Sequence, residues 1–253
     1  MNLPNRHIQN LLDCLTRSRL SFALYRLPWT DECYFVLQQS GDVEQLADIR
    51  ELNKKKGFVM APFLQSDHHP LIVIRPDITA YDWDEISEAI SSLECADALL
   101  TCKNQTEKLS PFVSEETDKE RYTQAFERFI TPLQKKHFQK LVLSRSSTKH
   151  INDDFSPLAA FVRACNNYPR MMIYLCHTPV SGTWVGSTPE ILLSGHGKEW
   201  HTVALAGTMP MQNEVMPMDW NKKNQDEQGY VADYIRRIIK KFGNKMNEKG
   251  PYT

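Results

Sequence analysis

The second half of the sequence alternates between helical patterns and short strand-like runs that are joined by turns. Residues 170–177 (RMMIYLCH) form one apolar run, TPVSG follows as a turn, and residues 183–187 (TWVGS) form a second run. Two further runs, ILLS and EWHTVALAG, flank the turn GHGK. Apolar runs of this length, separated by turn residues, are typical of antiparallel hairpins. The pattern therefore predicts an α/β (α+β) fold, in which a meander of antiparallel strands is flanked by helices.

Five segments have the spacing of amphipathic helices, with apolar residues that recur every three or four positions. The segment at 155–167 has the clearest start, because Ser156 is a good cap and Pro157 suits the first helical turn. The predicted inward-facing residues are Ile8, Leu11, Leu12 and Leu15; Ile86, Ile90 and Leu93; Tyr122, Phe126, Phe129, Ile130 and Leu133; Leu158, Phe161, Val162 and Cys165; and Val231, Tyr234, Ile235, Ile238, Ile239 and Phe242.

The first hundred residues predict a sheet but contain no obvious chemistry. Strand-like runs at 21–27, 33–39, 57–64 and 71–76 are rich in Tyr, Phe and Val. The pair His68-His69 lies between two of these runs and is interpreted as a solvated loop rather than a metal site. Residues 101–116 are polar and rich in turn formers, which predicts a linker or a surface crossing.

Composition excludes several classes of function. The chain has 30 basic and 31 acidic residues, a net charge of −1, so it has no basic field that would attract nucleic acid or anionic lipid. No apolar run reaches membrane-spanning length and the start lacks a signal-peptide pattern, so we expect a cytoplasmic protein. The 6 cysteines are scattered without a Cys-x-x-Cys pair, which favours reduced, mostly buried thiols.

Residues 140–145 (KLVLSR) follow the helix pattern at 118–133 and predict a strand. Lys140 stands at the start of that strand, where alternation puts it on one face with Val142 and Ser144. A lysine in such a position usually extends its amine into solvent. Taken alone, Lys140 is therefore interpreted as a solvated residue.

Two carboxylates stand at positions that allow two interpretations. Glu190 follows Thr188-Pro189, a pair that ends a strand, and is either a solvated turn residue or a functional acid. Glu227 lies on the apolar stripe of the last helix, one turn before Val231. A buried carboxylate needs a partner, so Glu227 is either a wet residue of the first turn or a ligand of Mg²⁺. Gly207 ends a strand-like run, where glycine lets a ligand approach the backbone.

Four blocks of this sequence, in this order, resemble the chorismate-binding enzymes. They are KLVLSR, GSTPEILL, TVALAGT and KNQDEQGYVADYI, spread over residues 140–235. Among these enzymes the blocks are most similar to isochorismate synthases of menaquinone or siderophore pathways. The resemblance implies an α/β fold with large antiparallel sheets and flanking helices. It also implies that residues 1–105 are the variable N-terminal part and that residues 106–253 are the chorismate-binding core.

The resemblance implies a role for each candidate residue in a Mg²⁺-dependent reaction on chorismate. Lys140 matches the base that activates water to attack C2, and Glu190 matches the acid that protonates the departing C4 hydroxyl. Gly207 and Thr208 match the loop whose backbone contacts the substrate, and Glu227 matches a Mg²⁺ ligand. Relatives that use ammonia carry Gln in place of this lysine. Salicylate synthases share the lysine and form the alternative, because they also eliminate pyruvate.

The resemblance further implies that the sequence is incomplete at its C-terminus. In these enzymes the chain continues past the helix of Glu227 and supplies a second metal carboxylate and an arginine for the substrate. Two expectations follow. The chain represents an isochorismate synthase that is a monomer and active when complete, and is itself an inactive fragment. Alternatively, it is a catalytically dead remnant that binds ligand weakly or serves only as a folding partner.

Overall fold

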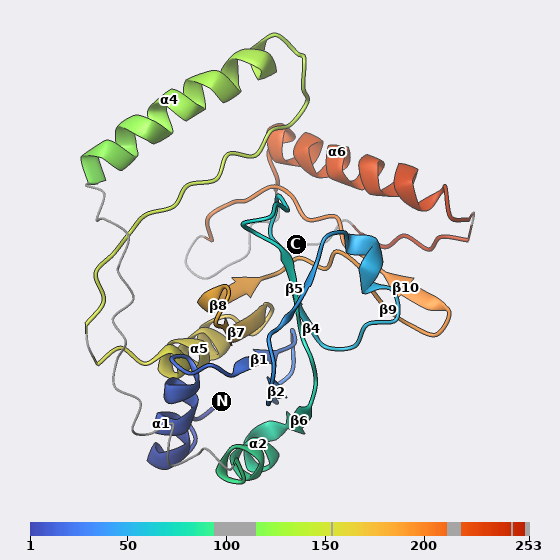
Figure 1. The fold of residues 1–253 in the computed structure, drawn as a ribbon. Helices are drawn as coiled ribbons and strands as arrows, with labels where there is room; N and C mark the ends of the chain where they lie inside the picture. The colour runs from blue at the N-terminus through green and yellow to red at the C-terminus, as the bar shows by residue number, and fades with distance from the viewer. Residues whose placement is uncertain (94–114, 153, 212–218, 244, 251–253) are drawn as a thin grey trace. The chain divides into compact units, whose positions relative to one another are not determined.

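The computed structural model describes residues 1–93, 115–152, 154–211, 219–243 and 245–250 (Figure 1). The chain forms two compact units. The first unit comprises Met1–Lys108 and Ile151–Pro189, and the second comprises Leu109–His150 and Glu190–Thr253. The compact units therefore do not follow a single division of the sequence near residue 105, because residues 151–189 fold together with the N-terminal part.

The first unit is built on a five-stranded sheet in which every pair of neighbouring strands is antiparallel. The strand order is β6 (Ile78–Tyr81), β2 (Tyr34–Gln38), β1 (Ser21–Arg26), β7 (Met172–Thr178) and β8 (Gly182–Thr188). The predicted hairpin of residues 170–187 is confirmed as β7 and β8. Strand β7 also pairs with β1, with Leu175 opposite Leu24, and this pairing joins the two distant segments of the unit.

A buried arginine reinforces the junction between β1 and the segment before β7. Arg26 is 3% exposed, and its guanidinium donates hydrogen bonds to the carbonyl oxygens of Thr30, Tyr168, Pro169 and Met171 at 2.7–3.2 Å. A buried charge is costly unless it is hydrogen-bonded, so these backbone acceptors compensate for the lost hydration.

A second sheet of three strands completes the first unit. Its order is β3 (Glu44–Leu46), β5 (Leu71–Ile74) and β4 (Phe58–Met60), and a 3₁₀ helix, η1 (Ile49–Leu52), follows β3. The sequence patterns did not predict β3 or β6. Both are too short to show a period of their own and exist because a longer strand, β5 or β2, supplies the hydrogen-bonding partner.

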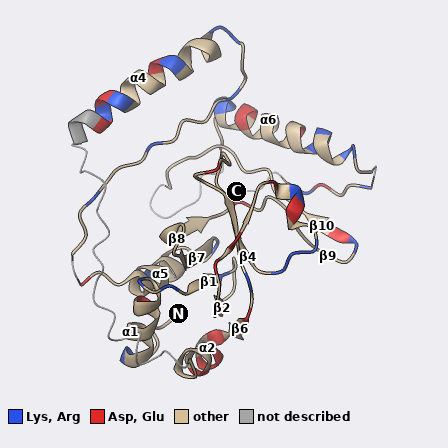
Figure 2. Ribbon diagram, in the orientation of Figure 1, with Lys and Arg blue, Asp and Glu red and all other residues tan. Residues whose placement is uncertain are grey.

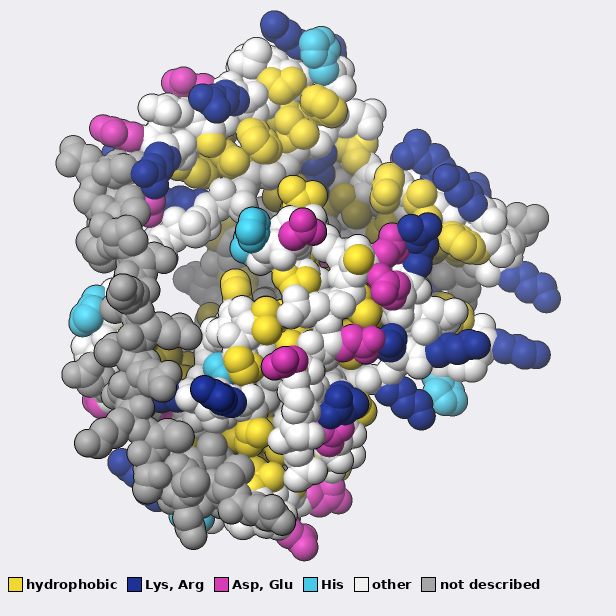
Figure 3. All heavy atoms as spheres, in the orientation of Figure 1, with side chains coloured by type: hydrophobic (Ala, Val, Ile, Leu, Met, Phe, Trp, Pro, Cys, Tyr) yellow, Lys and Arg dark blue, Asp and Glu magenta, His cyan; other side chains and the backbone are white. Residues whose placement is uncertain are grey.

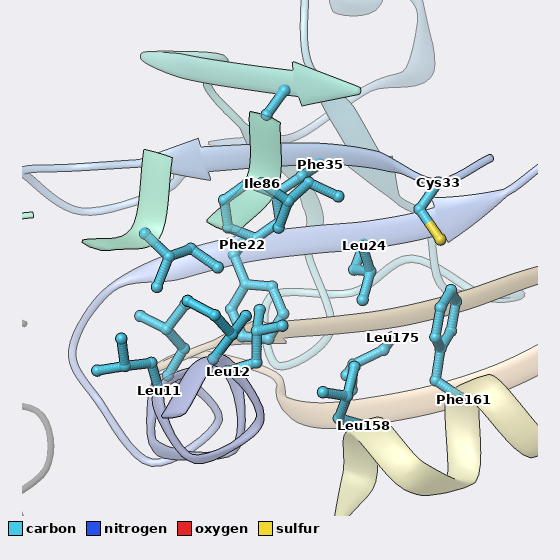
Figure 4. Packing of buried hydrophobic residues seen from close by; sticks show 14 of the residues in the cluster. Leu11, Leu12, Phe22, Leu24, Cys33, Phe35, Ile86, Leu158, Phe161 and Leu175 are labelled. Carbon is cyan, nitrogen blue, oxygen red and sulfur yellow. The ribbon is translucent and has the colours of Figure 1, made fainter. Parts of the chain in front are cut away.

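Three helices and the five-stranded sheet enclose the main core (Figure 4). The helices are α1 (Arg6–Leu15), α2 (Asp82–Ser91) and α5 (Pro157–Asn167), as the periodicity predicted. Ser156 caps α5 by accepting a hydrogen bond from the Ala159 backbone N–H. On β1 the side chains alternate, so Phe22 and Leu24 join the core with the helices while Ala23 joins a second core with residues of β5.

In the residues that the structure describes, the second unit has two helices and one short hairpin. These are α4 (Glu115–Gln134), α6 (Lys222–Ile239), and the hairpin of β9 (Ser194–His196) and β10 (Glu199–His201). Both helices lie where the sequence predicts them, but their apolar faces are not buried. None of the described side chains of α4, residues 118–134, is buried, and apolar side chains gather on its surface in Figure 3.

Of the strands predicted in the second unit, one is wrong and another is shorter than predicted. Residues 140–145 form no strand in the structure, and Val142 is 76% exposed. A strand needs a partner for its backbone N–H and C=O groups, and in the part of the chain that the structure describes this segment is in no sheet. Residues 202–207 likewise lie outside the ladder, because β10 ends at His201. The Thr202 hydroxyl nevertheless bonds the carbonyl oxygens of Ile191 and Leu192.

Candidate functional site

Most of the predicted site residues lie around the first two turns of α6. The helix starts after Asn221, whose side chain accepts a hydrogen bond from the Asn224 backbone N–H at 2.9 Å. This cap satisfies one of the backbone donors that a helix start leaves free. Charged residues cluster at both ends of α6 in Figure 2, with Arg236 and Arg237 in the last turn. Cations at that end complement the helix dipole.

Glu227 lies between two lysines. The Nζ atom of Lys140 is 3.1 Å from Glu227 Oε1, and the Nζ atom of Lys223 donates to Glu227 Oε2 at 2.7 Å. The side chains of Lys140 and Glu227 are 29% and 24% exposed, whereas that of Lys223 is 77% exposed. Hydrogen bonds from Lys223 and Lys140 lower the pKa of Glu227 to about 2. Glu227 is therefore an anion at neutral pH, with an ammonium group on each of its carboxylate oxygens.

Gly207 and Thr208 pack against the same part of α6. Gly207 has φ +81°, and a Cβ atom there would lie 3.2 Å from Asn224 Cβ and 3.3 Å from the Trp220 ring. The Asn224 side-chain amide donates a hydrogen bond to the Thr208 carbonyl oxygen at 3.2 Å. Both the positive φ and the close approach favour glycine at position 207. The backbone of these two residues is thus fixed to the helix that carries Glu227.

Glu190 does not take part in these particular contacts. Strand β8 ends at Thr188, Pro189 follows, and Glu190 is exposed at the next position. The prediction that Thr-Pro ends the strand is confirmed, and Glu190 makes interactions of its own. The structure thus brings Lys140, Glu227 and the Gly207-Thr208 backbone together through α6, whereas Glu190 lies in the segment that leads from β8 into β9.

Asn224 and Trp220 were not singled out by the sequence patterns, although both contact the predicted substrate loop. The sequence pattern indicated Glu227 because a charged residue on an apolar helical stripe needs a partner. Asn224 gave no such indication, since Asn is common near the start of a helix. The one sequence signal for Asn224 was its spacing of three residues before Glu227, which makes the two residues neighbours on a helix surface.

Glu227 has the right chemistry for a Mg²⁺ ligand, because it is an ionised, partly exposed oxygen donor. A metal cation bound to the Glu227 carboxylate would displace the ammonium groups of Lys140 and Lys223 from its oxygens. Within the described ranges, no group of three or more His, Cys, Asp or Glu side chains could hold a metal ion. A single carboxylate of this kind would hold Mg²⁺ only together with oxygens of a substrate or water.

Other candidate groups give no further site. His68 and His69 are both exposed, as predicted for a loop. Among the described residues, Cys14, Cys33, Cys165 and Cys176 form no disulfide, whereas Cys95 and Cys102 lie outside the described residues. Burial raises the pKa of Cys33 and of Cys176 to about 12, so neither is a thiolate at neutral pH. Among the helices that the structure describes, none combines the length and apolar character of a membrane span.

A family model described as "Chorismate binding enzyme" matches residues 49–251 of the chain. This match covers strands β4 and β5 of the three-stranded sheet, strands β6 to β10, and every residue of the site around α6. It also covers all four sequence blocks that resemble this family. A comparison with curated proteins found no match.

Proposed function

The chain belongs to the chorismate-binding enzyme family, and from this premise we propose that it is an isochorismate synthase. Family membership indicates a chorismate-utilising enzyme. The choice of reaction rests on one residue, Lys140, because the resemblance associates a lysine at this position with water as the nucleophile. The contact between Lys140 and Glu227, at 3.1 Å, supports the proposal, since it joins the two residues to which the resemblance gives the roles of base and metal ligand.

The proposed reaction exchanges one hydroxyl position for another and changes no oxidation state. Water adds its oxygen to C2 of chorismate, the ring double bonds shift, and the C4–O bond breaks. Lys140, as a neutral amine, accepts the proton that the attacking water loses, and Glu190, as a neutral acid, donates a proton to the departing hydroxyl. Exchange of both residues with solvent then restores their starting protonation states, so the product is an isomer of the substrate.

The ion pair with Glu227 sets a condition on this mechanism. An ammonium group that is bonded to a carboxylate has no lone pair with which to accept a proton, so Lys140 must leave Glu227 before it can act as a base. Glu227 would hold the Mg²⁺ ion, which supplies positive charge for a substrate carboxylate. In this proposal Glu227 would hold the metal, and Lys140 would act on water once it is released from Glu227 and has lost a proton.

Gly207 and Thr208 supply backbone groups to the substrate in this proposal. Gly207 is in the left-handed backbone conformation, which glycine adopts without steric cost. Backbone donors and acceptors that are fixed by contacts to a helix orient a ligand without reorganising. The product would enter menaquinone or siderophore synthesis.

The test is a product assay on the purified chain. We would incubate it with chorismate and MgCl₂ and separate the products by reversed-phase chromatography against authentic isochorismate. Pyruvate would be measured in parallel by a coupled lactate dehydrogenase assay. Isochorismate without pyruvate supports the proposal, and pyruvate with salicylate supports the alternative salicylate synthase. Unchanged chorismate contradicts both and supports the catalytically dead remnant.

A matched lysine variant makes this assay specific for the site. Lys140→Ala should abolish product formation, whereas Lys149→Ala, an exposed lysine in the same irregular segment, should not change it. Equal loss in both variants would mean that the segment, rather than the Lys140 amine, is required.

A further inference from the structure

We propose that Asn224 is a positioning residue for the substrate, because it holds the Gly207-Thr208 backbone in place against the first turn of α6. This inference rests on the proposed function, in which that backbone contacts chorismate. It adds to that function a residue that neither the sequence blocks nor the family match assigns.

The burial of Asn224 is the first observation. It is 4% exposed and is the one buried residue of α6, although the same helix carries several large apolar side chains that stay partly exposed. A side-chain amide in a buried position is unfavourable unless its polar atoms are bonded. Asn224 is therefore buried while apolar residues of the same helix are not. This unusual burial indicates that its side chain makes a specific contact.

That contact is with the substrate loop. The Asn224 amide nitrogen donates to the Thr208 carbonyl oxygen at 3.2 Å, and the Asn224 backbone N–H is already used by the cap residue Asn221. The Asn224 backbone oxygen and Cβ lie 3.3 Å and 3.2 Å from the position that a Gly207 Cβ would take. A Cβ atom at position 207 would therefore be in tight contact with the helix.

The position of Asn224 along α6 explains why this packing matters for a ligand. Asn224 precedes Glu227 by three residues, so the two side chains are neighbours on the helix surface. One rigid helix end therefore carries both the clamp on the substrate loop and the carboxylate that pairs with Lys140. Loss of the clamp should loosen substrate binding and leave the carboxylate and its cation partners in place.

The test replaces the amide by an apolar group of similar size, Asn224→Leu. Gln225→Leu is the control, because Gln225 is the next residue and also donates its side-chain amide to a backbone oxygen, that of Trp220 at 2.7 Å. Calorimetry would measure the Kd for chorismate in the presence of MgCl₂, and separately the Kd for Mg²⁺ alone. Steady-state assays would give KM and kcat.

We expect Asn224→Leu to raise the Kd and KM for chorismate about tenfold, the order of effect of one lost hydrogen bond. The Kd for Mg²⁺ and the kcat should stay within about twofold, and Gln225→Leu should change none of these values. A variant that melts at a lower temperature but binds chorismate like the wild type would show a structural role only and overturn the inference. Equal losses of chorismate and Mg²⁺ binding would also overturn it.

A second variant keeps the test decisive if Asn224→Leu does not fold. Gly207→Ala places a methyl group against Asn224 from the loop side and should weaken chorismate binding in the same way. In the double variant the loss of chorismate binding free energy should be smaller than the sum of the two single losses, because both substitutions break the same contact. Full additivity would contradict the clamp. A wild-type chain that binds no chorismate would refute the proposed function and this inference together, whereas normal binding by the variants would refute this inference alone.

Discussion

The two units of the molecule differ in what they bury. In the first unit large apolar side chains such as Phe22, Phe35 and Phe161 are less than 2% exposed and form one core between sheet and helices. In the second unit Phe126 is 47% exposed and Tyr234 is 57% exposed, while the one buried residue of α6 is the polar Asn224. Apolar burial therefore organises the first unit, whereas polar contacts at one end of α6 join the segments that the structure describes around it in the second.

This difference implies that one unit provides most of the stability of the chain and the other carries the candidate site. Hydrophobic burial is the main stabilising contribution in proteins, so the free energy of unfolding should depend mostly on the first unit. The predicted site residues all belong to the second unit, where charges and backbone groups are accessible to a ligand. Variants of the two units should accordingly fail in different assays.

The largest expected effect is on turnover. Lys140→Ala should lower the rate of isochorismate formation by about 10²–10⁴, the usual contribution of a positioned general base, with little change in the Kd for chorismate. The midpoint of urea unfolding should stay near that of the wild type, since Lys140 is partly exposed and outside the core. Product formation near the wild-type rate would show that Lys140 is only a partner of Glu227.

A pair of phenylalanine variants tests the other side of the comparison. Phe22→Ala should destabilise the chain by about 3–5 kcal/mol, because it leaves a cavity among fully buried neighbours. Phe126→Ala should change the free energy of unfolding by no more than about 0.5 kcal/mol, as expected for an exposed side chain. Urea titrations followed by circular dichroism give both values. Similar losses in the two variants would break the comparison, since they would mean that α4 contributes to a core.

Two carboxylate variants separate roles within the second unit. Glu190→Gln should lower turnover about 10²-fold at every Mg²⁺ concentration, because an amide cannot donate a carboxylic proton. Glu227→Gln should raise the Mg²⁺ concentration needed for half-maximal activity roughly tenfold, because an amide oxygen is a weaker ligand for a hard cation. Activity would be measured over a MgCl₂ series. Rescue of Glu190→Gln by extra Mg²⁺, without rescue of Glu227→Gln, would mean that the two roles are reversed.

The sequence predicted the first unit well because its elements are periodic and buried. The helix at 155–167, with Ser156 as its cap, and the hairpin of residues 170–187 lie where the patterns place them. The pairing of β1 with β7 could not be predicted, since no local pattern tells a strand which distant strand lies beside it. In the second unit, residues 140–145 have strand composition but no partner strand, so propensity alone gave the wrong answer.

The candidate site was predicted in part. The position of Glu227 on an apolar stripe indicated a partner, and Lys140 and Lys223 are the partners found in the structure. The identity of those partners could not be predicted, because Lys140 reaches Glu227 from a segment without regular structure. Asn224 was missed for the related reason that its contact with Thr208 depends on how the chain returns after residue 208.

The smallest expected effect concerns Lys223, whose ammonium group is on Glu227 Oε2 at 2.7 Å while 77% of its side chain is exposed. An exposed pair with Lys four residues before Glu contributes little to helix stability, so Lys223→Gln should change the free energy of unfolding by less than about 0.5 kcal/mol. The same substitution removes a cation that competes with Mg²⁺ for the carboxylate. The Kd for Mg²⁺ should therefore fall roughly two- to fivefold, equivalent to about 0.4–1 kcal/mol.

Calorimetric titration of Mg²⁺ into the wild type and the variant measures this shift, and Lys222→Gln is the matched control. Lys222 is the preceding residue and has the same i,i+4 spacing to its partner, but that partner is Asp226 and not Glu227. An equal shift in both variants would reflect the general loss of one positive charge near the site. A shift confined to Lys223→Gln would mean that Glu227 is the residue that receives the metal, and that its two lysines are the groups that the metal displaces.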